Sequence, residues 1–171
     1  MNDLCTELEL RLARHEWFHE NDAFIAWLDT TEGIERCIAY GLDTTRERDD
    51  WATFEGYVYV AIQRPDVRYS PMLCAVLAQH VLDVNFEDIV QALGEIKDPR
   101  SVECLAATLK WEPDWDEFRA LAVKCVWALA ASGTDEAWAA LDAAATEGPD
   151  VIREEVDYER GRRSSRGPAP M

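Results

Sequence analysis

Apolar side chains recur every three or four positions along most of this chain, as they do on one face of an α-helix. The clearest such run is expected to form one helix over 115–131, with these inward-facing positions: Phe118, Leu121, Ala122, Cys125, Val126 and Leu129. Leu4, Leu8 and Leu12 begin a similar stripe near the N-terminus, and the helix expected after Asn85 has a stripe of Phe86, Ile89, Val90 and Leu93. Alternating patterns that would indicate β-strands are almost absent. The sequence therefore predicts an all-α protein.

Capping and stop residues divide these stripes into separate helices. The residues expected to cap helix starts are Thr31, Ser70, Asn85, Asp98, Asp114 and Thr134. The helix after Thr31 should stop at Gly41, because glycine commonly ends helices. The helix expected over 70–83 is apolar on nearly all sides, which indicates a central position and a buried His80.

Two stretches of the helical region are similar to each other. Residues 92–105 align with 128–141 at a spacing of 36 positions, and each stretch reads as a helix end, a tight turn and a helix start. Self-similarity at this period is typical of stacked helical pairs. Because such repeats contact mainly their neighbours and expose an extended surface, binding is the default expectation for their function.

The turn segment Leu93-Gly94-Glu95-Ile96-Lys97-Asp98-Pro99-Arg100-Ser101-Val102 resembles that of bacterial HEAT-like repeats. Phe118-Arg119-Ala120-Leu121-Ala122 is similar to the first helix of such a pair. The resemblance covers 85–147, extends to 49–83 and 149–160, and does not include 1–47. It implies an armadillo-type, HEAT-like α-solenoid of stacked antiparallel helix pairs, and it implies that the protein binds other proteins.

Three regions follow from these patterns. Residues 1–47 are expected to form a short helical N-terminal region or cap, and 48–160 the HEAT-like repeats. Residues 161–171 form a basic tail that has too little apolar surface to fold and is predicted to be disordered. With 171 residues and 48% hydrophobic content, the chain is long enough for one domain with a sizeable core.

Cysteine usage and the N-terminus bear on the compartment. The cysteines are odd in number, widely spaced and embedded in helical patterns: Cys5, Cys37, Cys74, Cys104 and Cys125. We interpret them as small buried hydrophobes in a reducing compartment, in preference to disulfides or a metal site. The acidic start of the chain lacks the pattern of a secretion signal, and no segment has the length and apolarity of a membrane span. The sequence thus predicts a cytoplasmic protein.

One local motif points to chemistry. His15-Glu16-Trp17-Phe18-His19 matches the His-Glu-x-x-His pattern, in which two imidazoles on one helical face hold Zn²⁺ and the glutamate activates water. Its flanking residues differ from those of metalloproteases, and only Glu32 or Glu35 are loose candidates for a third ligand. On a helical wheel the two histidines also continue the N-terminal leucine stripe, which favours a structural role. A zinc-dependent hydrolase is therefore the alternative function, and no cofactor is predicted.

The charge distribution indicates the kind of partner. The formal net charge is −17, and the arginines of the last 13 residues stand apart from an acidic body. Such a body attracts a basic protein and repels nucleic acid and anionic membranes. An immunity or inhibitor protein that masks a basic toxin, such as a nuclease, would fit this description. The alternative is that the charge serves only to keep the protein soluble. A nucleic-acid-binding protein, similar to HEAT-like DNA glycosylases, is the weakest alternative, and a small-molecule ligand is not indicated.

Candidate contact residues follow from the repeats and the tryptophans. Trp51, Trp127 and Trp138 lie on apolar stripes and are expected in the core. Trp111 and Trp115 bracket an inter-repeat turn, where two interpretations are open: the rings pack over the helix ends, or they anchor a partner. If the second helices of the repeats line the concave face, their carboxylates form an acidic surface. The predicted partner-binding residues are Glu103, Trp111, Asp114, Trp115, Asp116, Glu117, Asp135, Glu136, Asp142 and Glu147.

Overall fold

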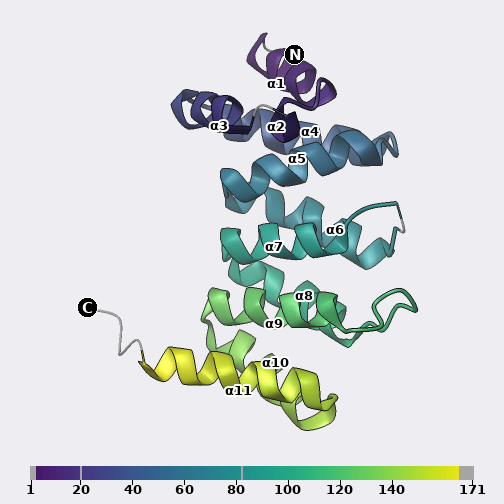
Figure 1. Ribbon diagram of the computed structural model, residues 1–171, viewed down its shortest axis with the longest axis vertical. Helices are drawn as coiled ribbons and strands as arrows, with labels where there is room; N and C mark the ends of the chain where they lie inside the picture. The colour runs from purple at the N-terminus through teal and green to yellow at the C-terminus, as the bar shows by residue number, and fades with distance from the viewer. Residues whose placement is uncertain (1–2, 20, 82, 166–171) are drawn as a thin grey trace.

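The computed structural model describes residues 3–165 except 20 and 82, and these residues form α-helices and two short 3-10 helices without a β-strand (Figure 1). The prediction of an all-α protein is confirmed. The α-helices are α1 (Asp3–Ala13), α2 (Glu16–His19), α3 (Asn21–Thr30), α4 (Ile34–Glu47), α5 (Trp51–Gln63), α6 (Ser70–Gln79), α7 (Phe86–Ile96), α8 (Val102–Lys110), α9 (Ala120–Ser132), α10 (Asp135–Glu147) and α11 (Asp150–Ser165). The 3-10 helices are η1 (Val67–Tyr69) and η2 (Pro99–Ser101).

From α4 onward the helices stack along the long axis of the molecule in two rows (Figure 1). The α5 row contains α5, α7, α9 and α11, each packed on the next, and the α4 row contains α4, α6, α8 and α10. Across the rows, α4 packs on α5, α6 on α7, α8 on α9, and α10 on both α9 and α11. The N-terminal helix α1 packs on α4 and α5 and so covers one end of the stack.

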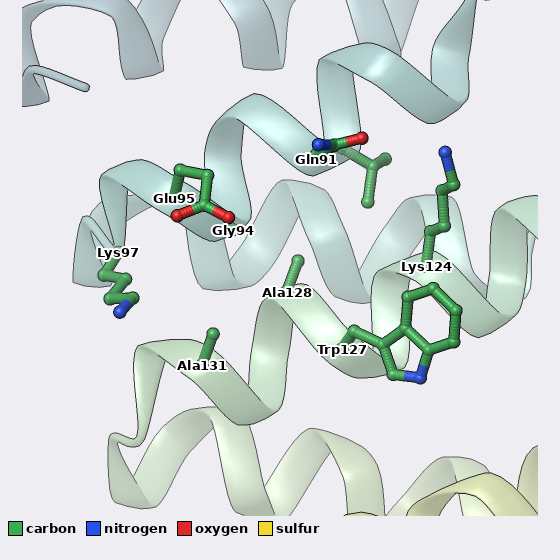
Figure 2. Close-up of a pocket in the computed structure, with 9 residues that line it drawn as sticks. Gln91, Gly94, Glu95, Lys97, Lys124, Trp127, Ala128 and Ala131 are labelled. Atoms are coloured by element: carbon green, nitrogen blue, oxygen red, sulfur yellow. The ribbon is translucent and has the colours of Figure 1, made fainter. Parts of the chain in front are cut away.

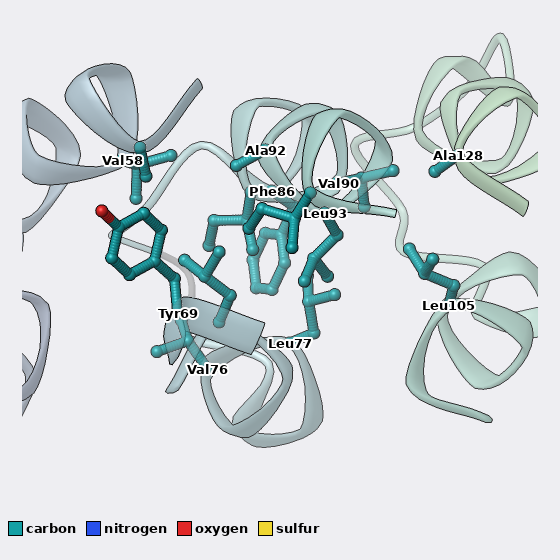
Figure 3. Close-up of a cluster of buried hydrophobic side chains, with 14 of the residues drawn as sticks. Val58, Tyr69, Val76, Leu77, Phe86, Val90, Ala92, Leu93, Leu105 and Ala128 are labelled. Carbon is teal, nitrogen blue, oxygen red and sulfur yellow. The ribbon is translucent and has the colours of Figure 1, made fainter. Parts of the chain in front are cut away.

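Apolar side chains from the two rows meet along the middle of the stack. Val76 and Leu77 of α6 face Phe86 and Leu93 of α7, and all four are buried (Figure 3). The stripe predicted for α7 is confirmed, because its members all belong to the core. Burial of each such side chain is worth about 1.5–3 kcal/mol, so the stripes hold the rows together.

Local capping signals set several helix starts as expected. The Asn85 side chain accepts hydrogen bonds from the backbone N–H groups of Glu87 and Asp88 at 3.0 and 3.4 Å. The Thr134 hydroxyl accepts one from the N–H of Ala137 at 3.1 Å. These bonds satisfy amide groups that have no partner within the helix, so the caps are determined within a few residues of sequence.

The predicted stop at Gly41 is wrong, because α4 continues through it to Glu47. A Cβ atom at position 41 would overlap the ring of Tyr57, so this glycine permits a close approach of α4 and α5. Thr31 does not cap α4 either: its hydroxyl donates to the carbonyl of Trp27 at 2.6 Å. The residue before α4 is Gly33, whose φ of 76° suits glycine.

Two helices are shorter than predicted. The expected helix over 115–131 begins only at Ala120, after Arg119 in a left-handed conformation, and Phe118 is 83% exposed. The expected helix over 70–83 ends at Gln79, because His80 has a φ of 50°. The prediction of a buried His80 is also wrong, since the residue is exposed.

The basic tail is helical over its first part. α11 runs to Ser165, so the predicted disorder is wrong for 161–165, while 166–171 lie outside the described residues. Arg162 pairs with Glu159 at 2.6 Å, and the guanidinium of Arg163 lies 4.8 Å from the ring centre of Trp138. These contacts stabilise a segment whose composition alone predicts no fold.

The cysteine interpretation is correct only for Cys125, which is a buried thiol whose pKa is raised by desolvation. Cys5 of α1 and Cys37 of α4 form a disulfide with a Cα–Cα distance of 4.8 Å, and Cys74 of α6 and Cys104 of α8 form another at 5.7 Å. Stacking brings together residues 32 and 30 positions apart. Because disulfides are rare in reducing compartments, the cysteines no longer support a cytoplasmic location.

No helix among the described residues combines the length and apolarity needed to cross a membrane.

Candidate functional site

The His-Glu-x-x-His motif does not lie on a single helix. α1 ends at Ala13, and His15 is an exposed residue with a φ of 56° that precedes the short helix α2. The Glu16 carboxylate pairs with Arg11 at 2.8 Å. The histidines therefore do not continue the N-terminal leucine stripe as one helical face. The side chain of His19 lies outside the described part of the chain.

The suggested third ligands do not complete a metal centre in the described residues. Glu35 pairs with Arg64 at 2.5 Å, and Glu32 is exposed. Among the side chains that the structure describes, no three His, Cys, Asp or Glu residues are grouped so that they could hold a metal ion.

A cluster of aromatic rings lies where the loop after α6 meets the loop after α8, on one side of the stack (Figure 1). His80 stacks on Trp111 with ring centres 3.9 Å apart and planes 3° from parallel. Trp111 contacts Phe86 and Trp115 edge to face, at 5.1 and 5.9 Å. Trp115 lies nearly parallel to Phe86 at 6.2 Å. The sequence predicted only Trp111 and Trp115 at this site, because no local sequence pattern relates His80 or Phe86 to the two tryptophans.

Backbone conformation positions this cluster. The left-handed conformation of His80 ends α6 and turns its ring toward Trp111. Asp116 is 7% exposed, and its carboxylate accepts a hydrogen bond at 2.6 Å from the N–H of Ala120, the first residue of α9. Asp116 thus differs from the other predicted contact residues, because its side chain holds the loop in place instead of facing solvent.

Exposed aromatic and acidic side chains surround the cluster. Trp115 is 49% exposed and Phe118 is 83% exposed. Glu112, Asp114 and Glu117 are also exposed. We call this region the aromatic loop edge; it consists of the buried ring of Phe86 and of His80, Trp111, Trp115, Phe118, Glu112, Asp114 and Glu117. Rings beside carboxylates form an environment that attracts cationic side chains.

A pocket of about 170 Å³ opens at this edge between Trp115 and the start of α7. Its lining includes Phe86, Asn85 and Glu87. The Glu87 carboxylate also pairs with Lys124 of α9 at 3.2 Å. The pocket therefore combines an aromatic wall with a carboxylate, as recognition of an arginine or lysine side chain requires.

The remaining predicted contact residues lie on the α4 row. Glu103 is on α8, and Asp135, Glu136, Asp142 and Glu147 are on α10, where all five are exposed. Asp142 pairs with Arg160 of α11 at 2.6 Å. The predicted residues thus form two groups, one on the α4 row and one in the loop between α8 and α9.

A groove between α7 and α9 was not anticipated from the sequence (Figure 2). It has a volume of about 400 Å³. Trp127, expected in the core, lines it and is 47% exposed. The sequence does contain a signal for this exposed face, because residues 120, 124, 127 and 131 lie on the side of α9 opposite its buried stripe.

No protein-family model matches this chain, and no curated protein is similar to it. Its candidate sites are therefore assigned from geometry and chemistry alone.

Proposed function

We propose that this protein is a non-enzymatic protein-binding module with a HEAT-like α-solenoid fold, and that it binds a basic protein partner through the aromatic loop edge. The observation that carries the proposal is the exposure of Trp115 and Phe118 among the carboxylates of Glu112, Asp114 and Glu117. The two-row packing of the helices and the sequence resemblance support the fold.

The chemistry of the edge favours a cationic segment. A guanidinium or ammonium group gains cation–π attraction over a tryptophan face and charge-assisted hydrogen bonds from nearby carboxylates. Trp111 is held by His80, Phe86 and Trp115, so little side-chain entropy is lost on binding. Pre-ordered aromatic anchors are typical of energetically dominant interface residues.

The carboxylates of the α4 row have a different role in this proposal. Glu103, Asp135 and Glu136 are exposed, and together with the net charge of −17 they draw a basic partner toward the protein. Such charges act mainly on the association rate, whereas buried anchors act mainly on dissociation. A basic toxin masked by an immunity protein is one example of a partner with this chemistry.

The zinc-hydrolase alternative has weaker support because His15 precedes α2 instead of lying on one helix with His19. We expect purified protein to contain little zinc. One equivalent of zinc by elemental analysis, lost in His15→Ala and His19→Ala, would restore that alternative. The nucleic-acid alternative depends on arginines of α11, and Arg160 and Arg162 are paired with carboxylates there.

Binding of defined peptides tests the proposal. The probes are fluorescein-labelled ten-residue peptides that alternate glycine with arginine, lysine or glutamate, and the readouts are anisotropy and stopped-flow rates. The edge variant Glu112→Gln/Asp114→Asn/Glu117→Gln and the single variant Trp115→Ala are compared with Glu103→Gln/Asp135→Asn/Glu136→Gln, which removes the same charge from the α4 row.

We expect the arginine peptide to bind, and the edge variants to speed its dissociation about tenfold, the range of a lost charged or aromatic anchor. The α4-row variant should slow association and flatten its salt dependence while leaving dissociation nearly unchanged. Equal effects of the two triple variants on dissociation, or equal binding of the glutamate peptide, would refute the aromatic loop edge as the site.

A further inference from the structure

The groove between α7 and α9 is built by a close helix approach. A Cβ atom on Gly94 would lie 3.2 Å from the Cα and Cβ atoms of Ala128, so small residues bring the two helices together. Gln91 of α7 and Trp127 of α9 lie on opposite walls of the groove, both toward the Lys124 end from this contact (Figure 2). The volume of about 400 Å³ is in the range of pockets that hold small molecules.

Lysines gather at this groove in a strongly acidic protein. The whole chain contains only Lys97, Lys110 and Lys124, and two of these three line the groove. Lys97 follows α7 in a left-handed conformation and is exposed. Lys124 pairs with Glu87, at 3.2 Å, and Glu95 also lines the groove. The lining itself carries two lysines and one glutamate, while Glu87, paired with Lys124, and Glu155, bonded to Trp127, lie beside it; the chain as a whole carries a net charge of −17.

The indole of Trp127 supplies a fixed aromatic surface. The side chain is 47% exposed, yet its N–H donates a hydrogen bond to the carboxylate of Glu155 on α11 at 2.5 Å. The ring is therefore held in place while part of its surface faces the groove (Figure 2). A ligand ring that stacks on an indole gains more than from apolar burial alone, and a held indole has less entropy to lose.

We propose that this groove is a binding site for a small aromatic carboxylate, with the ligand ring on Trp127 and its carboxylate near Lys124, which lies at the same end of the groove as Trp127 (Figure 2). An ammonium group is a compact charge that binds a carboxylate well. The volume accommodates one ring system, and Lys97, at the opposite end of the groove, adds a more distant positive charge (Figure 2). Nucleic acid or a long acidic segment would also meet Glu87, Glu95 and Glu155, and the acidic body would repel it.

This site is distinct from the aromatic loop edge, because it selects the opposite charge. The pair between Glu87 and Lys124 lies between the two sites: Glu87 lines the pocket at the edge, and Lys124 lines the groove. The proposal for the groove does not depend on a basic protein partner. The sequence by itself does not indicate a small-molecule ligand.

Three isosteric probes test the proposal by calorimetry with the full chain: 2-naphthoate, neutral 2-naphthalenemethanol and cationic 2-naphthylmethylammonium. The variants are Lys97→Met, Lys124→Met and Trp127→Leu, and Ala131→Leu adds a side chain that fills the groove. Lys110→Met is the matched control, because Lys110 is an exposed residue at the end of α8 and its replacement removes the same charge outside the groove. Circular dichroism melts establish that each variant is folded.

We expect 2-naphthoate to bind at least about tenfold more tightly than the alcohol, since charge-assisted hydrogen bonds are the stronger kind. Lys124→Met and Trp127→Leu should each weaken naphthoate binding about fivefold or more, Lys97→Met and Ala131→Leu, at the far end of the groove, should weaken it less, and Lys110→Met should not change it. The proposal is overturned if the ammonium probe binds as tightly as naphthoate, if Lys124→Met or Trp127→Leu binds like the parent, or if naphthoate shows no binding up to about 10 mM.

Discussion

Gly41 provides a sharp test of how α4 and α5 pack. In Gly41→Ala the new methyl group would occupy space that the Tyr57 ring fills, and that ring is buried. Replacing glycine by alanine inside a helix normally stabilises it by about 0.5–1 kcal/mol. Overpacking of a filled core costs about 1–3 kcal/mol, so the substitution should destabilise the protein overall.

The size of the effect depends on where the ring goes. If the Tyr57 ring shifts within the core, the net loss is about 1–2 kcal/mol, the overpacking cost less the helix gain. If the ring leaves the core, the loss approaches the range of about 3–5 kcal/mol known for deleting a large aromatic side chain. We therefore expect a decrease of about 1–4 kcal/mol in the free energy of unfolding, measured by urea denaturation.

Gly161→Ala is the matched control for this experiment. Gly161 lies within helix α11, and no heavy atom lies within 4 Å of an added Cβ there. The same substitution should therefore stabilise the protein by about 0.4–1 kcal/mol. The two variants should change stability in opposite directions. A stabilised Gly41→Ala, or an equal loss for Gly41→Ala in a Tyr57→Ala background, would refute the packing of Tyr57 against Gly41 as the cause.

Three further predictions concern the core, a disulfide and an acidic turn. Leu141→Ala should cost about 2–5 kcal/mol in urea denaturation because it leaves a cavity at a fully buried site; a cost below 1 kcal/mol would contradict its core position. Cys74→Ser/Cys104→Ser should lower the free energy of unfolding by about 3–4 kcal/mol, because the disulfide closes a loop with a sequence separation of 30 and its loss frees that loop in the unfolded chain. Reductant should then change the stability of this variant less than that of the parent. The hydrogen bonds from Arg100 lower the pKa of Asp98 in the folded state, so this carboxylate stabilises the protein above about pH 4, and the stabilisation is lost as the pH falls through the folded pKa. In Asp98→Asn the free energy of unfolding should therefore depend less on pH in that acidic range. An unchanged acid profile would contradict the assignment.

The sequence by itself determined the helical class and many helix starts. Asn85 and Thr134 cap helices by bonding to amide groups two or three residues away, so their action depends on no distant contact. The periodic stripe of α7 likewise predicted which of its side chains would be buried. Trp111 and Trp115 could be singled out because they bracket a turn, where aromatic residues are candidates for partner contacts.

Other features depended on contacts between distant segments. Gly41 lies inside helix α4, where it leaves room for the ring of Tyr57 on the next helix. The disulfides required neighbouring helices to place Cys5 near Cys37 and Cys74 near Cys104. The stacking of His80 on Trp111 and the exposure of Trp127 at the groove between α7 and α9 likewise depend on the tertiary structure. Local sequence specifies hydrogen bonds and periodicity within an element, whereas the space between elements is decided by how complete side chains pack together.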